Sequence, residues 1–252
     1  MLSFALDTAD IGVVVDELNL PRRWQPFELP EVGRTQQERR DHVDAAWHRV
    51  RNAGLLDGNR LDAEVEGVFS AWVDPDLLVI VRAHQTEGQQ QLLYRVTATR
   101  GTGVFSQLVG DQVHFEEIHK QAAIPEITSE LPPVPALSGL GELTVTRGNA
   151  SDEVAEEDFN PLASSAPSGT AAAEQREMRK FAQWPLQRLC SFELSVRNGN
   201  KLNPLGTAQV IDTDGGRYVI LPDGTQRLRI IPSDGSHLTR WLADQAELGM
   251  DS

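Results

Sequence analysis

Residues 210–219 read VIDTDGGRYV, two short apolar segments on either side of an acidic and glycine-rich centre. The paired aspartates resemble the start of a cation-binding loop, which would need an oxygen ligand at its fifth position and glycine at its sixth. Counted from Asp212, these positions hold Gly216 and Arg217, so the spacing argues against a cation. Aspartate and glycine favour a tight turn between antiparallel strands instead. We therefore expect a positive φ at Gly216 or at the glycine before it, and Tyr218 packed on a sheet.

This hairpin belongs to one of two groups of four predicted strands. Within each group the strands are joined by short turns containing glycine or aspartate, which can connect only antiparallel neighbours. The first group is expected at residues 76–83, 90–100, 103–110 and 111–118, and the second at 191–196, 206–213, 216–222 and 226–232. One more strand is expected within residues 138–146. The pattern therefore predicts two antiparallel meanders.

Helices are expected around both meanders. Thr35 and Glu38 form a capping-box pattern at the start of a helix that Gly54 is placed to end. Two further helices are expected from about Asp62 to Trp72 and in the region up to Leu131. Another is expected over residues 171–190, where Pro185 kinks the helix or starts a second one. The last helix is expected from about Ser236, with Leu238, Trp241 and Leu242 on one face.

The two halves of the sequence follow the same plan, and Gly101 in the first half aligns with Gly215 in the second. The predicted fold class is α+β. It is a quasi-two-fold duplicated unit of helix, four-stranded antiparallel meander and helix, whose two halves form a central antiparallel sheet flanked by helices. Joining the meanders edge to edge would hide two sheet edges. The halves are expected at residues 1–147 and 171–252, and residues 148–170 form an acidic flexible linker with few apolar side chains.

The composition restricts the classes of partner. The chain has 252 residues and a formal net charge of −14, which opposes binding to nucleic acid and to anionic lipid. The beginning of the sequence lacks the pattern of a signal peptide, and no apolar segment is long enough to span a bilayer. The single cysteine, Cys190, fits a reducing compartment. The sequence therefore predicts a cytoplasmic protein that neither inserts into membranes nor binds nucleic acid.

Patterns that carry chemistry are weak. The sequence contains neither a G-x-S-x-G nucleophile motif nor a G-x-x-x-x-G-K phosphate loop. His114 and His119 are five residues apart, which on a strand places them on opposite faces. We therefore predict no catalytic residue, no metal and no cofactor. An aromatic patch near Pro185, formed by Phe181 and Trp184, indicates a protein-binding surface instead.

Four stretches, read in order along the chain, resemble the EspG family of ESX (type VII) secretion-associated proteins. They are a G-x-T-x-x-E-R helix start at residues 33–39 with GLLD at 54–57, DPDLLVIV at 74–81, LPPVPALSGLGELTVT at 131–146, and VIDTDGGRYV at 210–219 with LRIIPSD at 228–234. The resemblance implies a non-catalytic cytosolic chaperone with a quasi-two-fold α/β fold. Such a chaperone binds the PPE member of a PE–PPE heterodimer at its helical tip, keeps the heterodimer soluble and directs it to export.

The resemblance also implies a contact surface for the partner. It maps to the hairpin around residues 84–91, to the last strands of the sheet and to helices of the second half. The candidate partner-binding residues are His84, Gln85, Glu87, Gln89, Phe181, Trp184, Leu238 and Trp241. The acidic linker departs from the family pattern because it is longer and richer in serine and alanine. In a relative with few PE–PPE proteins, another small helical type VII substrate is an alternative partner. Formation of a homodimer is a further alternative.

A second class of function is a small-molecule-binding protein or an enzyme with a cleft between the two halves. Its polar groups would be His84, His114, Glu116, Asp212 and Asp214. A deep pocket that gathers several of them would favour this alternative.

Overall fold

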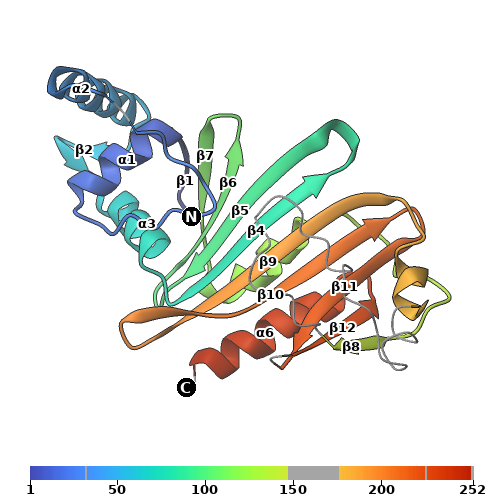
Figure 1. Cartoon of the computed structure of the whole chain (residues 1–252). Helices are drawn as coiled ribbons and strands as arrows, with labels where there is room; N and C mark the ends of the chain where they lie inside the picture. The colour runs from blue at the N-terminus through green and yellow to red at the C-terminus, as the bar shows by residue number, and fades with distance from the viewer. Residues whose placement is uncertain (32, 147–175, 225, 251–252) are drawn as a thin grey trace.

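The computed structural model describes residues 1–31, 33–146, 176–224 and 226–250, and its largest element is a ten-stranded sheet (Figure 1). The strand order is β1-β7-β6-β5-β4-β9-β10-β11-β12-β8, and every neighbouring pair is antiparallel. The strands are β1 (Ser3–Asp7), β4 (Leu77–Gln85), β5 (Gln90–Ala98), β6 (Gly103–Val109), β7 (Gln112–Ile118), β8 (Leu143–Thr146), β9 (Leu186–Asn198), β10 (Lys201–Thr213), β11 (Gly216–Asp223) and β12 (Arg227–Pro232).

The predicted α+β class and the joining of the two meanders into one antiparallel sheet are confirmed. β4 of the first meander pairs with β9 of the second, from Leu77 opposite Val196 to Gln85 opposite Arg188. The strand order is symmetric about this pair, because β1 flanks the last strand of the first meander and β8 flanks the last strand of the second. The internal duplication stays a prediction.

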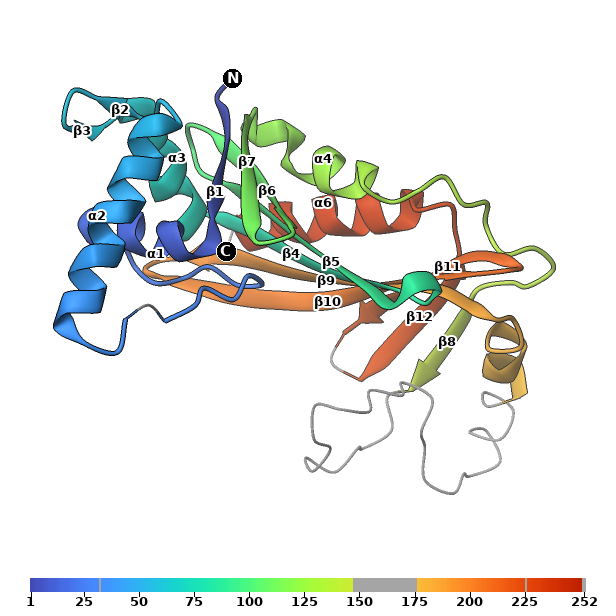
Figure 2. The same ribbon diagram turned by 90° about the horizontal axis from the view of Figure 1, so that it is seen from above.

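The helices gather at the ends and on the faces of the sheet (Figure 2). Their bounds are α1 (Thr8–Glu17), α2 (Gln36–Asn52), α3 (Ala63–Val73), α4 (Ala123–Ser129) and α6 (Ser236–Met250), with short 3-10 turns η1 (Glu87–Gln89) and η2 (Lys120–Ala122) and a small hairpin of β2 (Leu56–Asp57) and β3 (Arg60–Leu61). Residues 176–181 are also helical. The predicted linker, residues 148–170, lies outside the described residues.

Apolar side chains fill both faces of the sheet. Val104 and Phe105 are neighbours on β6 but belong to different core clusters, since successive strand residues point to opposite faces. The face that includes Phe105 is covered by α4 and α6 and forms the larger core. The opposite face packs on α1 and α3 in the first half, and in the second half it packs on a cluster that includes Leu137 and Phe181.

Several local predictions are confirmed. Thr35 Oγ1 accepts from the Glu38 N–H at 3.2 Å, and the Glu38 carboxylate accepts from the Thr35 N–H at 3.1 Å, which completes the capping box of α2. Gly54 follows that helix with a φ of +73°. Gly216 has a φ of +126°, and Tyr218 is buried on the sheet.

The predicted helix over residues 171–190 is wrong after Phe181, and its first residues, 171–175, lie outside the described residues. Helical structure ends at Phe181, and β9 begins at Leu186. Pro185 explains the change, since a proline lacks a backbone N–H and disfavours helical geometry at the residue before it. Cys190 and Phe192, two residues apart, are both buried in the core, which a strand achieves because every second side chain lies on the same face. The structure also shows β1 and α1, which the sequence analysis did not predict.

Candidate partner-binding surface

The hairpin between β4 and β5 carries four of the predicted contact residues. His84, Glu87 and Gln89 are exposed and Gln85 is half-buried, at the end of a hairpin that reaches one end of the sheet (Figure 1). Gly88 and Gln89 both have positive φ values, +77° and +49°. This left-handed pair closes the turn and leaves polar side chains facing solvent.

The start of β9 and the β10–β11 turn reach the same end of the sheet. The Thr86 N–H donates to the Gln187 carbonyl at 3.0 Å, and the Asp214 N–H donates to the Pro185 carbonyl at 3.2 Å. The Gln187 amide also donates to the Asp214 carboxylate. We define the sheet-end surface as residues 84–91, residues 184–187 and Asp214.

Two large apolar side chains are exposed on the sheet-end surface. Trp184 is 41% exposed and Leu186 is 43% exposed. The Trp184 ring lies against Gly215, where an added Cβ would come within 2.6 Å of a ring carbon. Glycine at this turn therefore supports an indole that stays half open to solvent. Exposed aromatic and aliphatic side chains next to polar groups are typical of protein interfaces.

Two predicted contact residues lie in the core. Phe181 is 4% exposed and packs edge-on against Tyr218, with ring centroids 5.3 Å apart. Leu238, near the start of α6, is fully buried. Neither side chain is accessible to a partner, so the aromatic patch expected from Phe181 and Trp184 reduces to Trp184. Trp241 is partly buried and packs against the larger core beside Gly206.

Leu186 is not among the predicted contact residues, because its segment was expected to be helical. The signal that could have found it is the alternation of Arg188, Cys190 and Phe192 after Pro185, which extends a strand toward the proline.

Asp212 and Arg217 from the VIDTDGGRYV stretch form a buried ion pair next to this surface. Arg217 Nε and Nη2 donate to the two Asp212 carboxylate oxygens at 2.6 and 3.0 Å. The same guanidinium donates to the Pro132 carbonyl at 2.9 Å and to the Asp234 carbonyl at 3.0 Å. The pair therefore ties the chain after α4 and the chain before α6 to the sheet. Because both Asp212 oxygens are used, they are not available to a cation.

The polar groups of the cleft alternative are brought together only in part, since His84 and Asp214 both belong to the sheet-end surface. His114 and Glu116 lie on β7, which is separated from β4 and His84 by two strands. Asp212 is buried and paired with Arg217. Within the described ranges, no group of three or more histidine, cysteine, aspartate or glutamate side chains could hold a metal ion.

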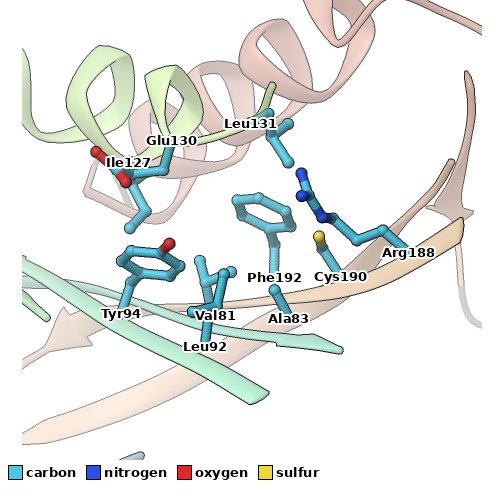
Figure 3. Close-up of a pocket in the computed structure, with 10 residues that line it drawn as sticks. All are labelled: Val81, Ala83, Leu92, Tyr94, Ile127, Glu130, Leu131, Arg188, Cys190 and Phe192. Atoms are coloured by element: carbon cyan, nitrogen blue, oxygen red, sulfur yellow. The ribbon is translucent and has the colours of Figure 1, made fainter. Parts of the chain in front are cut away.

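A small cavity lies between α4 and the strands β4, β5 and β9 (Figure 3). Its volume of about 20 Å³ matches a single water. Burial raises the pKa of the Cys190 thiol in its floor to about 12, and burial together with Glu126 raises the pKa of Glu130 at its edge. A thiol with such a pKa is inert as a nucleophile.

A second hollow of about 310 Å³ opens beside Pro132 and the start of α6, above Arg217. The Arg217 guanidinium already makes four hydrogen bonds, so it presents no unpaired charge.

None of the helices in the described ranges is long and apolar enough to cross a membrane.

Comparison with known proteins agrees with the motifs read from the sequence. The fold is similar to that of the Mycobacterium tuberculosis type VII secretion system chaperone EspG5, solved in complex with a PE25-PPE41 dimer. The TM-score is 0.63 at 11% identity, over 96% of this chain and 95% of that chain. No curated protein matches the sequence. The EspG family matches residues 8–244, nearly the whole chain, and the protein therefore belongs to the EspG family.

Proposed function

We propose that this protein is a secretion chaperone that binds a PE–PPE-type heterodimer, or another small helical substrate, of a type VII secretion system. The observation that carries the proposal is the family match over residues 8–244 together with the fold shared with EspG5. The chaperone keeps its substrate soluble in the cytoplasm and directs it to export. It acts by binding alone and catalyses no reaction.

The sheet-end surface is the substrate-binding site in this proposal. Trp184 and Leu186 supply apolar area, and tryptophan is the residue that most often dominates binding energy in interfaces. His84, Gln85, Glu87 and Gln89 surround them with polar groups that can hydrogen-bond to the ends of substrate helices. Phe181 and Leu238 are buried in separate core clusters and are not part of the proposed contact, and Trp241 is a candidate only for its partly exposed edge.

The chemistry of the described residues supports binding without catalysis. The histidines and carboxylates of the cleft alternative are dispersed over separate strands. The thiol of Cys190 is buried, and its pKa is raised to about 12. A net charge of −14 favours the solubility of a chaperone that carries an aggregation-prone substrate.

Co-expression tests the proposal. The full chain is co-expressed with PE–PPE pairs encoded next to its gene, and complexes are separated by size-exclusion chromatography. We expect one pair to elute with the chaperone as a stable complex. Failure of every such pair to form a soluble complex would contradict the proposal.

A surface variant locates the site. We expect the double substitution Trp184→Ala and Leu186→Ser to weaken substrate binding by about 100-fold, as the loss of a central interface aromatic does. The matched control is Val109→Ser, which removes another exposed apolar side chain (51% exposed) from the β6–β7 hairpin. Equal losses in both variants would place the binding site elsewhere.

A further inference from the structure

The cavity under α4 has the composition of a binding pocket for an apolar group. Val81, Ala83, Cys190 and Phe192 form its floor, and Leu131 lies at its edge (Figure 3). Leu131 is only partly buried, so apolar surface continues from the cavity to the outside. Pockets that receive an anchoring side chain combine such a floor with a few polar groups at the edge.

Arg188 is the polar group whose bonding is incomplete. Its Nε is buried and has no hydrogen-bond partner, and among the described residues its side chain makes no hydrogen bond at all. The nearest carboxylate is Asp212, 4.0 Å from Nη1, and both oxygens of that carboxylate already accept from Arg217. A buried donor without an acceptor is costly, so a ligand that brings an oxygen to this guanidinium gains free energy.

The cavity lies beside the part of the sheet-end surface that Gln85 contributes. Arg188 is opposite Gln85 at the end of the β4–β9 pair, so the two side chains lie on the same face of the sheet. Leu186 pairs with Thr213 beyond a bulge and lies on the other face. The side chain of Arg188 is 20% exposed, and Figure 3 shows its guanidinium beside Leu131 and Phe192. A partner that contacts Gln85 on the sheet-end surface can therefore reach both the cavity and the guanidinium.

We propose that this cavity is an anchor pocket for the substrate: it receives one small apolar side chain from the C-terminal end of a substrate helix, and Arg188 donates to a free carbonyl oxygen of that helix end. This inference rests on the proposed function. The last four carbonyls of a helix lack intrahelical partners and carry partial negative charge, which suits a cation that lacks an acceptor. The volume of about 20 Å³ admits a methyl group or a slightly larger group and excludes an aromatic ring.

Two substitutions in the full-length chaperone test the anchor pocket against a co-purified PE–PPE pair. Ala83→Val fills the cavity from its floor, and Arg188→Lys keeps the charge but removes the planar guanidinium. We expect each substitution to raise the dissociation constant of the complex by about tenfold, while Val109→Ser leaves it unchanged. Thermal denaturation of the free chaperone is measured alongside. Arg188→Lys carries the test should Ala83→Val lower the melting temperature.

The outcomes separate the two proposals. A wild-type chain that binds a pair, with both variants binding equally well, overturns the anchor pocket and leaves the chaperone proposal intact. A wild-type chain that binds no pair overturns both. The pocket could instead be occupied by a second copy of this chain, which light scattering of the free chain tests. A change of self-association in Ala83→Val would assign the pocket to that second copy and overturn the inference.

Discussion

Two arginines, one in each half of the sheet, are almost completely buried but are stabilised in different ways. Arg217 on β11 is 1% exposed and forms a bidentate pair with Asp212, with N–O distances of 2.6 and 3.0 Å. Arg95 on β5 is also 1% exposed, but no carboxylate among the described residues contacts it. Its guanidinium donates to the backbone carbonyls of Gln25 and Trp72 and lies 5.1 Å from the centre of the Trp72 ring.

The difference shows two ways of using a buried cation to join segments that are distant in sequence. At Arg217 the charge is neutralised, and the remaining donors hold the segment after α4 and the segment before α6. At Arg95 the charge is solvated by carbonyl dipoles and an aromatic face, and its Nε has no partner. Burial lowers the pKa of Arg95 to about 9. The first arrangement depends on its carboxylate, whereas the second depends on packing.

The largest effect is expected from Asp212→Asn. The substitution leaves the Arg217 guanidinium buried without a counter-charge, which costs about 3–5 kcal/mol. Urea denaturation measures the loss as a shift in midpoint. Asp214→Asn, in the same turn but exposed, is the control and is expected to cost less than about 1 kcal/mol. A similar small cost for Asp212→Asn would show that the pair contributes little.

A glycine substitution in the turn beside Arg217 is expected to rank second. Gly216 has a φ of +126°, and an added Cβ would lie 2.9 Å from the Leu137 backbone. Gly216→Ala should therefore cost about 2 kcal/mol or more, since strain and a backbone clash add. In the other half, Gly110 has a φ of +61° and open space around it. Gly110→Ala is therefore expected to lower the free energy of unfolding by about 1 kcal/mol. Equal melting temperatures for the two variants would contradict this ranking.

Arg95→Met is expected to cost less than Asp212→Asn. Methionine leaves the carbonyls of Gln25 and Trp72 without this donor, which costs about 1–3 kcal/mol, but it also removes the cost of burying a cation. A net loss near 1 kcal/mol in urea denaturation is the expected result. A loss as large as that of Asp212→Asn would mean that Arg95 contributes as much as a neutralised ion pair.

These contrasts also explain what the sequence could and could not predict. Local chemistry was sufficient for the Gly216 turn, the Thr35 capping box and the meanders, because neighbouring residues decide them. The helix predicted through Cys190 was wrong because its helix-forming composition was outweighed by pairing with β4 and β10, which is a long-range effect. The burial of Phe181 and the partners of Arg217 depend on segments distant in sequence, so the sequence alone could not predict either of them.

The smallest expected effect concerns alkaline pH, where two buried groups act in opposite directions. The pKa of Cys190 is raised to about 12 by burial, so the unfolded chain loses this proton first and stability falls as the pH rises above about 9. The pKa of Arg95 is lowered to about 9, so the folded chain loses that proton first and stability rises over the same range. Each slope is on the order of 1 kcal/mol per pH unit.

Because the two slopes oppose each other, the wild-type free energy of unfolding should change little between pH 8.5 and about pH 10, below the range where Tyr218, with its pKa raised to about 12, begins to contribute. In Arg95→Met the free energy of unfolding should fall with rising pH, and in Cys190→Ala it should rise. Urea denaturation at several pH values measures both changes. A flat profile for Cys190→Ala would show that the guanidinium keeps its proton. In that case the carbonyls of Gln25 and Trp72 and the indole ring compensate for burial of the charge more fully than the lowered pKa of Arg95 indicates.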